Sequence, residues 1–152
     1  MIAVINFGGQ TCHLIARRVR EIGAYSQILN SDVSAEEIKG MHPDGIILSG
    51  GPSSVYEKNA PYIDSRILGL GIPILGICYG FQLIAKLSNG EVVAGNLKEF
   101  GKKTLRIKKS SKLLKGFSNR EQIWMSHGDI VVRLSTDFEL IGSTDTCKYA
   151  VA

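Results

Sequence analysis

A cysteine flanked by glycines separates a short apolar run from a segment with helical spacing, and this junction constrains the fold more than any other stretch. The run at residues 72–75 predicts a buried strand, and residues 81–87 repeat apolar side chains at helical spacing. Between them lies Gly76-Ile77-Cys78-Tyr79-Gly80. A sharp turn would strain the backbone at Cys78, and the glycines remove Cβ atoms that would clash. The junction predicts a nucleophile elbow, whose helix N-terminus favours the thiolate, or else a buried cysteine beside a tight turn.

Other apolar runs upstream of this junction have the length of buried strands and alternate with helical patterns. The strand candidates are residues 1–6, 24–29 and 45–49, and the helix candidates are residues 11–22, 34–40 and 59–68. Thr11 is expected to cap the first helix, and Ser34 with Glu37 predicts a capping box for the second. The alternation predicts an α/β fold with a doubly wound, mostly parallel sheet and helices on both of its faces.

Three loops follow predicted strands, at residues 7–10, 50–54 and 78–80. Ligands of doubly wound sheets bind outside the carboxyl ends of the strands, so these loops are expected to meet at one edge. The Gly50-Gly51-Pro52 turn could point backbone N–H groups outward as an anion or oxyanion cradle, or it could be a plain tight loop. Together the three loops favour a binding site at this edge.

After Asn89-Gly90 the pattern changes to short strand candidates without a confident helix. They are residues 91–94, 103–107, 122–125, 130–133, 138–141 and 149–152. This part is too short and too poor in apolar residues for a second domain, so it is expected to extend the sheet of a single domain, residues 1–152.

A dense polar cluster, Trp124-Met125-Ser126-His127-Gly128-Asp129, stands within that strand-rich part. Its serine, histidine and aspartate could bind a small zwitterion. Taken by itself, His127 is a candidate general base for Cys78. The alternative is a turn capped by Asp129.

Composition limits the class of protein. Three widely spaced cysteines with no CxxC pair argue against a disulfide framework and a zinc site and favour a reducing cytoplasm. No apolar run has the length of a membrane span, and no secretory signal opens the chain. The segment 102–120 carries eight basic residues and no acidic one, but its single aromatic residue, Phe117, argues against a nucleic-acid site. A solvated strand face, or a docking surface for an acidic partner, is expected there.

Several motifs, in order along the whole chain, resemble class I glutamine amidotransferases. They are Asn6-Phe7-Gly8-Gly9-Gln10, residues 14–21, Ile47-Leu48-Ser49-Gly50-Gly51-Pro52, residues 76–82, Glu99-Phe100-Gly101 and residues 124–129. The cysteine elbow and the Gly-Gly-Pro loop mark the family. The helix at residues 14–21 and the run at residues 124–129 point to the branch whose glutaminase serves an ATP-pyrophosphatase. The resemblance implies a flavodoxin-like fold.

The resemblance also implies a mechanism. Cys78 would attack the carboxamide of glutamine, and the N–H groups of Gly51 and Tyr79 would hold the oxyanion. Gln82, Ser126 and Asp129 would hold the substrate's α-amino and carboxylate groups, and His127 would be a binding-loop residue rather than the base. Ammonia would pass to the synthetase domain or subunit, which aminates adenylated XMP to GMP. No cofactor is expected in this domain; ATP and Mg²⁺ would act in the synthetase.

One departure from the family concerns the general base. The family's catalytic histidine and glutamate lie in a His-Pro-Glu segment, which these 152 residues do not contain. We therefore expect a domain incomplete at its C-terminus, with weak or no activity alone, because general acid–base help is worth about 10²–10⁴-fold. The competing hypotheses are a non-catalytic glutamine-binding or regulatory module and the glutaminase of another amidotransferase, such as that of anthranilate synthesis. A smaller departure is Asn6, where the family usually has aspartate.

Overall fold

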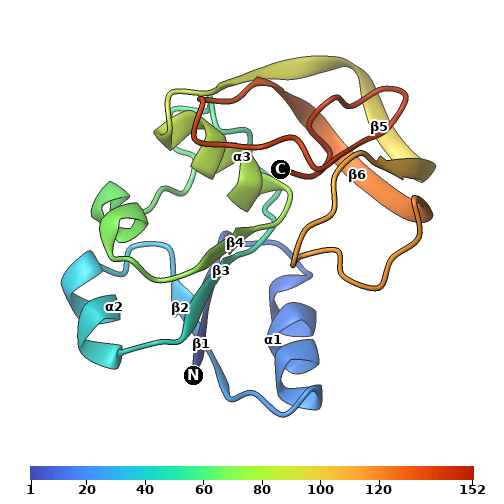
Figure 1. Ribbon diagram of the computed structural model, residues 1–152. Helices are drawn as coiled ribbons and strands as arrows, with labels where there is room; N and C mark the ends of the chain where they lie inside the picture. Colours follow the sequence, from blue (N-terminus) through green and yellow to red (C-terminus); the bar gives the residue numbers. More distant parts are fainter. The chain divides into compact units, whose positions relative to one another are not determined.

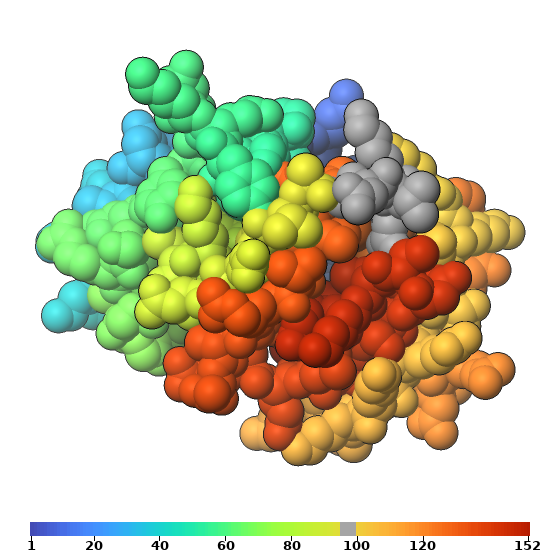
Figure 2. All heavy atoms as spheres, turned by 90° about the horizontal axis from the view of Figure 1, so that it is seen from above, coloured from blue at the N-terminus to red at the C-terminus, as the bar shows by residue number. Residues whose placement is uncertain are grey.

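The computed structural model describes residues 1–94 and 100–152, which fall into two units, Met1–Leu87 and Ser88–Ala152. Each unit has its own sheet, parallel in the first and antiparallel in the second. The described residues are coloured along the chain in Figure 2. Among them, the longest helix has ten residues, and none is long and apolar enough to cross a membrane.

Four parallel strands form the sheet of the first unit, in the order β2-β1-β3-β4 (Figure 1). They are β1 (Ile2–Asn6), β2 (Ser26–Asn30), β3 (Gly45–Leu48) and β4 (Ile74–Gly76). Val4 stands opposite Ile28 on one side and Ile47 on the other. Val4, Ile5 and Leu48 are fully buried, as expected of central strands covered on both faces.

The elements that connect the strands are α1 (Cys12–Glu21), α2 (Ala35–Met41), the short 3₁₀ helix η1 (Ser65–Gly69) and α3 (Tyr79–Leu87). Figure 1 shows α1 and α2 on opposite faces of the parallel sheet. The connections from β1 to β2 and from β2 to β3 run in opposite directions across the sheet, so right-handed crossovers place their helices on opposite faces. The predicted α/β fold with a doubly wound sheet is confirmed.

Helix α1 packs on the sheet through small side chains. Cys12 and Ala16 are buried against Val4, with Ile15 partly buried beside them. Thr11 occupies the N-cap position, but its side chain makes no capping hydrogen bond, so that prediction was wrong. Its backbone is already helical, at φ −78° and ψ −13°, whereas a capping side chain needs an extended residue at this position.

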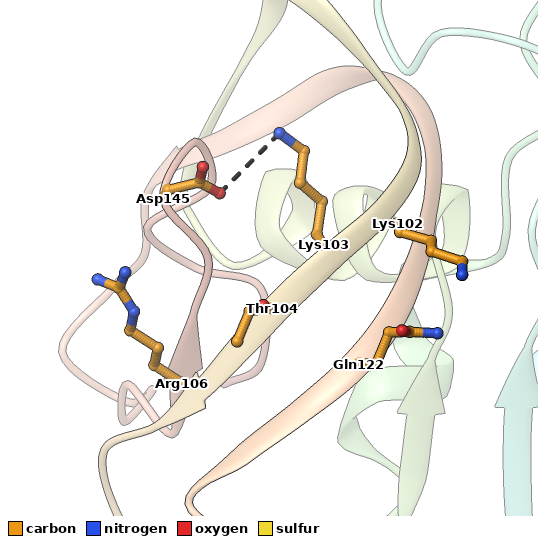
Figure 3. Close-up of a pocket in the computed structure, with 6 residues that line it drawn as sticks. All are labelled: Lys102, Lys103, Thr104, Arg106, Gln122 and Asp145. Atoms are coloured by element: carbon orange, nitrogen blue, oxygen red, sulfur yellow. Dashed lines mark ion pairs between the residues drawn. The ribbon is translucent and has the colours of Figure 1, made fainter.

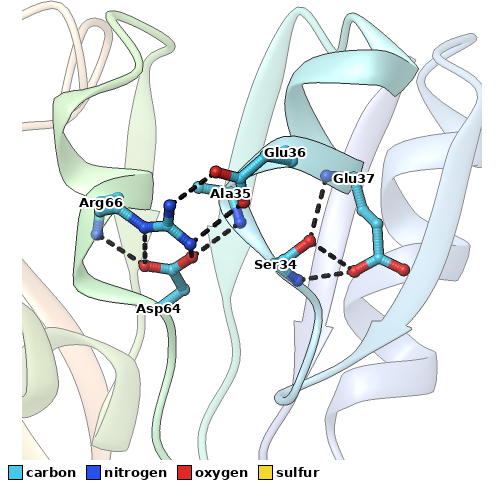
Figure 4. A network of polar contacts seen from close by, with 6 residues as sticks. All are labelled: Ser34, Ala35, Glu36, Glu37, Asp64 and Arg66. Carbon is cyan, nitrogen blue, oxygen red and sulfur yellow. Dashed lines mark hydrogen bonds and ion pairs between the residues drawn. The ribbon is translucent and has the colours of Figure 1, made fainter.

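A polar network joins the start of α2 to η1 (Figure 4). The capping box predicted from Ser34 and Glu37 is present. The carboxylate of Asp64 accepts the N–H of Ala35 and that of Arg66, each at 3.0 Å, so one side chain caps both helices. The Arg66 guanidinium, which also pairs with Glu36 at 2.6 Å, holds the pKa of Asp64 far below its ordinary value.

The prediction of a helix over residues 59–68 was wrong, because only the short 3₁₀ helix η1 forms in that region. Pro61 explains most of the difference. Proline lacks the N–H that a helix interior requires, and it disfavours the helical conformation of the residue before it. Helical structure therefore begins only after Asp64, which caps it.

The second unit is a three-stranded antiparallel sheet with the order β6-β5-β7. Its strands are β5 (Glu91–Ile107), β6 (Arg120–Arg133) and β7 (Gly142–Ser143). The expectation that this part extends the parallel sheet was wrong, since among the described residues its strands pair only with one another. Residues 138–141, predicted to be a strand, precede β7 without forming one. The C-terminal residues, red in Figure 2, lie against the preceding part of this unit, where Val151 bridges Gly142.

Candidate active site

Cys78 lies between the end of β4 and the first residue of α3, in a left-handed backbone conformation with φ 52°. Left-handed conformations are strained for residues other than glycine. Hydrogen bonds on both sides hold the turn: the Gly80 N–H donates to the Ile77 carbonyl at 3.0 Å, and the Gln82 N–H donates to the Cys78 carbonyl at 3.0 Å. The side chain of Cys78 is half-buried. The predicted strained strand-to-helix turn is therefore present.

The two glycines that flank the turn leave no room for a side chain. A Cβ atom on Gly76 would lie 2.7 Å from the backbone N and Cα of Phe81. A Cβ atom on Gly80 would lie 2.7 Å from the carbonyl carbon of Leu48 and closer still to its oxygen. The start of α3 thus packs directly on its own strand and on the end of β3, and the prediction that side chains at these two glycines would clash is confirmed.

The Gly50–Gly51 loop lies beside the cysteine. A Cβ atom on Gly50 would stand 3.5 Å from the Cβ atom of Cys78. A Cβ atom on Gly51 would stand 2.6 Å from the carbonyl oxygen of Phe7, and one on Gly9 would overlap the Gly50 carbonyl. The turn after β1 and the loop after β3 therefore interlock backbone to backbone, next to Cys78. The three loops that were predicted to meet at one sheet edge therefore do so: loop 7–10 interlocks with loop 50–54, and loop 50–54 lies beside Cys78.

Ser49, fully buried, connects these segments. Its hydroxyl donates to the Gly50 carbonyl at 3.1 Å and accepts the Phe7 N–H at 3.3 Å. Its own carbonyl accepts the N–H of Gly80 at 3.1 Å. Burial raises the pKa of the neighbouring Cys12 thiol, and a hydrogen bond to Ser49 partly offsets that effect. The sequence placed Ser49 at a strand end and within the Gly-Gly-Pro motif but predicted no role for it; its polar side chain after an apolar run was the available signal.

The side chain of Tyr79 packs inside the unit. The ring lies 5.1 Å from that of Phe7, centroid to centroid, and its hydroxyl donates to the Pro61 carbonyl. Burial raises the pKa of this phenol most. The negative charge of Glu57 raises it further, and the charge of Tyr62 adds a smaller increase. Since the side chain is anchored in this way, the backbone is the part of Tyr79 that lies at the elbow. As the first residue of α3, its N–H has no partner within the helix.

Four of the seven predicted site residues lie together in the first unit. They are Cys78, Tyr79, Gly51 and Gln82; the side chain of Gln82 is buried one helical turn after the cysteine. Ser126, His127 and Asp129 lie on β6 of the second unit, with Ser126 opposite Phe100 and Asp129 opposite Ala94. Of the motif Glu99-Phe100-Gly101, Glu99 lies outside the described residues.

The second unit carries a polar pocket of about 320 Å³ on β5 (Figure 3). Its lining residues are Lys102, Lys103, Thr104, Arg106, Gln122 and Asp145. Lys103 and Asp145 approach to 3.9 Å, whereas Figure 3 shows Lys102 directed away from that pair. Within the two described ranges, no group of histidine, cysteine and acidic residues could hold a metal ion.

The fold and the elbow define the class of protein. Residues 3–152 match the family described as glutamine amidotransferase class-I, and the chain belongs to that family. Within it, the chain is 49% identical over 150 residues to the glutamine-hydrolysing GMP synthase of Aquifex aeolicus and 44% identical over 149 residues to that of Vibrio parahaemolyticus. Each comparison covers at least 98% of this chain but only 29% of the relative, so the chain spans less than a third of those enzymes.

Solved structures agree with this assignment. The crystal structure of a putative GMP synthase subunit from Thermoplasma acidophilum superposes with a TM-score of 0.85 at 32% identity, over 97% of this chain and 74% of that one. A glutamine amidotransferase from Thermotoga maritima superposes with a TM-score of 0.75 at 21% identity, over 97% of this chain and 68% of that one. The second likeness shows the shared fold alone.

Proposed function

We propose that these 152 residues form one amidotransferase domain, the glutaminase part of a GMP synthase, in which Cys78 is the nucleophile. The observation that carries the proposal is the strained backbone of Cys78, at φ 52°, directly beside the Gly50–Gly51 loop. This turn places the sulfur at the start of α3, where the helix dipole favours a thiolate. The identity to glutamine-hydrolysing GMP synthases supports glutamine as the substrate.

The reaction starts with attack of the Cys78 sulfur on the carboxamide carbon of glutamine. A C–S bond forms, and the carbonyl electron pair moves to the oxygen. The N–H groups of Gly51 and Tyr79 stabilise that oxyanion, and one such donor is worth about 3–4 kcal/mol of transition-state stabilisation. The C–N bond then breaks as the general base, which has taken the proton of the thiol, passes that proton to the nitrogen, and ammonia leaves. Water hydrolyses the thioester to release glutamate and restore the thiol.

The substrate's charged end is held by a different set of residues. Gln82, buried one turn after the nucleophile, binds it from α3. Ser126 and Asp129 bind the α-amino and α-carboxylate groups from β6, and His127 belongs to the same binding segment. The mixture of an amide, a hydroxyl and a carboxylate suits a zwitterion, which needs both donors and acceptors.

The general base comes from outside these 152 residues. The histidines of the chain are His13, His42 and His127, and none belongs to a His-Pro-Glu segment. The 152 residues alone are therefore expected to hydrolyse glutamine about 10²–10⁴-fold more slowly than the intact protein.

Ammonia released at Cys78 is consumed by an ATP-pyrophosphatase, or synthetase, part that aminates adenylated XMP. The GMP synthases that this chain resembles extend well beyond it, which supports a synthetase in the same protein or in a partner subunit. ATP and Mg²⁺ act in that part, and the glutaminase itself needs no cofactor. This metabolic role places the protein in the cytoplasm.

Covalent labelling with the chloroketone analogue of glutamine tests the proposal. The intact protein should gain one adduct, mapped by mass spectrometry to Cys78, and glutamine should protect against it. Cys12 and Cys147, both buried, serve as internal controls because they should stay unmodified. Labelling that glutamine does not slow, or an adduct on another residue, would contradict the proposal.

A further inference from the structure

We propose that Ser49 is a positioning residue that orients both oxyanion donors of the glutaminase at once; this inference rests on the proposed function. Ser49 is not one of the residues proposed to react with the substrate or to bind it. Its side chain is buried at the end of β3, between the turn after β1 and the start of α3. Its hydrogen bonds link it to the peptide unit that presents the Gly51 N–H and to the Tyr79–Gly80 peptide unit, which directly follows the one that presents the Tyr79 N–H.

The first link is the hydrogen bond from the Ser49 hydroxyl to the Gly50 carbonyl, at 3.1 Å. That carbonyl and the N–H of Gly51 belong to the same peptide unit. A trans peptide is planar, so its C=O and N–H point in opposite directions. Because the carbonyl is held toward the fully buried Ser49, the Gly51 N–H is directed away from the core. The hydroxyl therefore determines where the first donor points.

The second link runs through the backbone of the same residue. The Ser49 carbonyl accepts the Gly80 N–H at 3.1 Å, one residue after the second donor, Tyr79. Gly80 can approach this closely only because it lacks a side chain. One residue thus holds the Gly50–Gly51 peptide with its side chain and the first turn of α3 with its carbonyl. The distance between the two donors depends on both bonds.

The hydroxyl itself has a defined orientation. A serine hydroxyl has one proton to donate and two lone pairs that accept. The Phe7 N–H occupies one acceptor position at 3.3 Å, the neutral Cys12 thiol is hydrogen-bonded at the other, and the proton goes to the Gly50 carbonyl. Because no side-chain atom of Ser49 reaches solvent, water cannot replace these bonds without opening the site. The loop after β3 is therefore preorganised by a buried side chain.

Loss of the hydroxyl should act on the transition state more than on substrate binding. The Gly50–Gly51 peptide would be free to rotate, and its N–H would no longer meet the oxyanion at the best angle. Removing a whole oxyanion donor typically costs about 10²–10³-fold in kcat. A donor that is present but misoriented should cost less, on the order of 10-fold to 100-fold. KM should stay within about twofold, because the oxyanion exists only after attack.

The test compares Ser49→Ala with Ser26→Ala in the intact protein. Ser26 is a matched control in the same unit: it is also buried, its hydroxyl donates to the Ala16 carbonyl at 2.8 Å, and it accepts a hydrogen bond from Arg20. Both variants should lose similar stability in urea unfolding. Only Ser49→Ala should lose kcat. Only Ser49→Ala should also bind the aldehyde analogue of glutamine about 10-fold to 100-fold more weakly, because that analogue forms a tetrahedral adduct with the thiol, whose oxygen needs the same two N–H donors. Ser49→Cys, which keeps a weak hydrogen-bonding group, should fall between Ser49→Ala and the wild type, and it replaces Ser49→Ala if that variant does not fold.

The outcomes separate this inference from the proposed function. If the wild type is labelled at Cys78 but Ser49→Ala keeps kcat and aldehyde affinity within twofold, the positioning role is wrong and the nucleophile assignment stands. If Ser26→Ala loses kcat as much as Ser49→Ala, the effect is general destabilisation, and the inference is also wrong. If Cys78→Ala still hydrolyses glutamine, the proposed function itself fails.

Discussion

The backbone N–H of Ile77 donates to the carbonyl oxygen of Leu48 at 2.9 Å, which ties the residue before the elbow cysteine to the end of β3. The pairing of β3 with β4 ends in the same register, with Leu48 opposite Gly76. The loop after β3 and the turn after β4 therefore begin at the same level of the sheet. This is why Cys78 comes to lie beside Gly50.

Replacing the nucleophile should abolish glutamine hydrolysis while leaving the synthetase reaction with free ammonia intact. Cys78→Ala removes the only group proposed to form the thioester, so kcat for glutamine should fall by on the order of 10⁴-fold or more. Glutamine-dependent and ammonia-dependent product formation are measured side by side. Cys147→Ala, at a buried cysteine of the second unit, is the control and should keep glutamine-dependent activity. Equal loss of both activities in Cys78→Ala would contradict the assigned role.

Gly80→Ala should be strongly destabilising. Its new Cβ atom would lie 2.7 Å from the carbonyl carbon and the Cβ atom of Leu48, and backbone cannot move aside as a flexible side chain can. We expect the free energy of unfolding to fall by at least about 2 kcal/mol, measured in urea. Gly40→Ala is the matched control: it lies in α2 with no atom near its Cβ position, and it should raise stability by up to about 1 kcal/mol. Similar stabilities of the two variants would show that the elbow tolerates a side chain.

Tyr79→Phe should separate the backbone of this residue from its side chain. The variant loses the hydrogen bond from the buried phenol to the Pro61 carbonyl, which should cost about 0.5–1.5 kcal/mol of stability. Because the proposed oxyanion donor is the backbone N–H, kcat should change by less than about threefold. Tyr25→Phe, at a tyrosine that is 66% exposed, should change neither quantity. A large loss of kcat in Tyr79→Phe without loss of stability would assign the phenol itself to the reaction.

Asp64→Asn should weaken the dependence of stability on acid pH. The pKa of Asp64 is lowered in the folded protein by Arg66 first and by the Ala35 N–H second. A carboxylate with a lowered folded pKa stabilises the protein above its unfolded pKa of about 3.9, and this contribution is lost as the pH falls below that value. Wild-type stability, from urea unfolding between pH 7 and pH 2.5, should therefore fall more steeply below about pH 4 than that of the variant. Parallel curves would contradict the network's role.

Asp129→Asn should raise KM for glutamine with a smaller effect on kcat, because the carboxylate is proposed to bind the substrate's α-amino group and not the reacting carboxamide. Loss of one hydrogen bond to a charged group typically costs about 1.5–3 kcal/mol, or about 10-fold to 150-fold in KM. Asp137→Asn, an exposed aspartate of the same unit, is the control and should leave KM unchanged. An unchanged KM in Asp129→Asn would remove this residue from the binding site.

Local chemistry in the sequence determined the strands of the first unit, the capping box at Ser34 and the strain at Cys78. Each follows from neighbours within a few positions: apolar runs for the strands, a serine three residues before a glutamate, glycines two residues either side of a cysteine. Local reasoning failed where one residue overrides a weak pattern, as Pro61 does within residues 59–68.

Only the tertiary structure decided how distant segments pair. The local sequence of residues 91–152 does not show whether these strands extend the first sheet or form a separate one. Strand pairing joins residues far apart in the chain, as the pairing of β5 with β6 does over most of their length. The hydrogen bond between Phe7 and Ser49 spans 42 positions and exists because β1 and β3 lie side by side in parallel register. A serine after an apolar strand is ordinary in sequence, and it gains its role from the three backbone segments that the sheet brings around it.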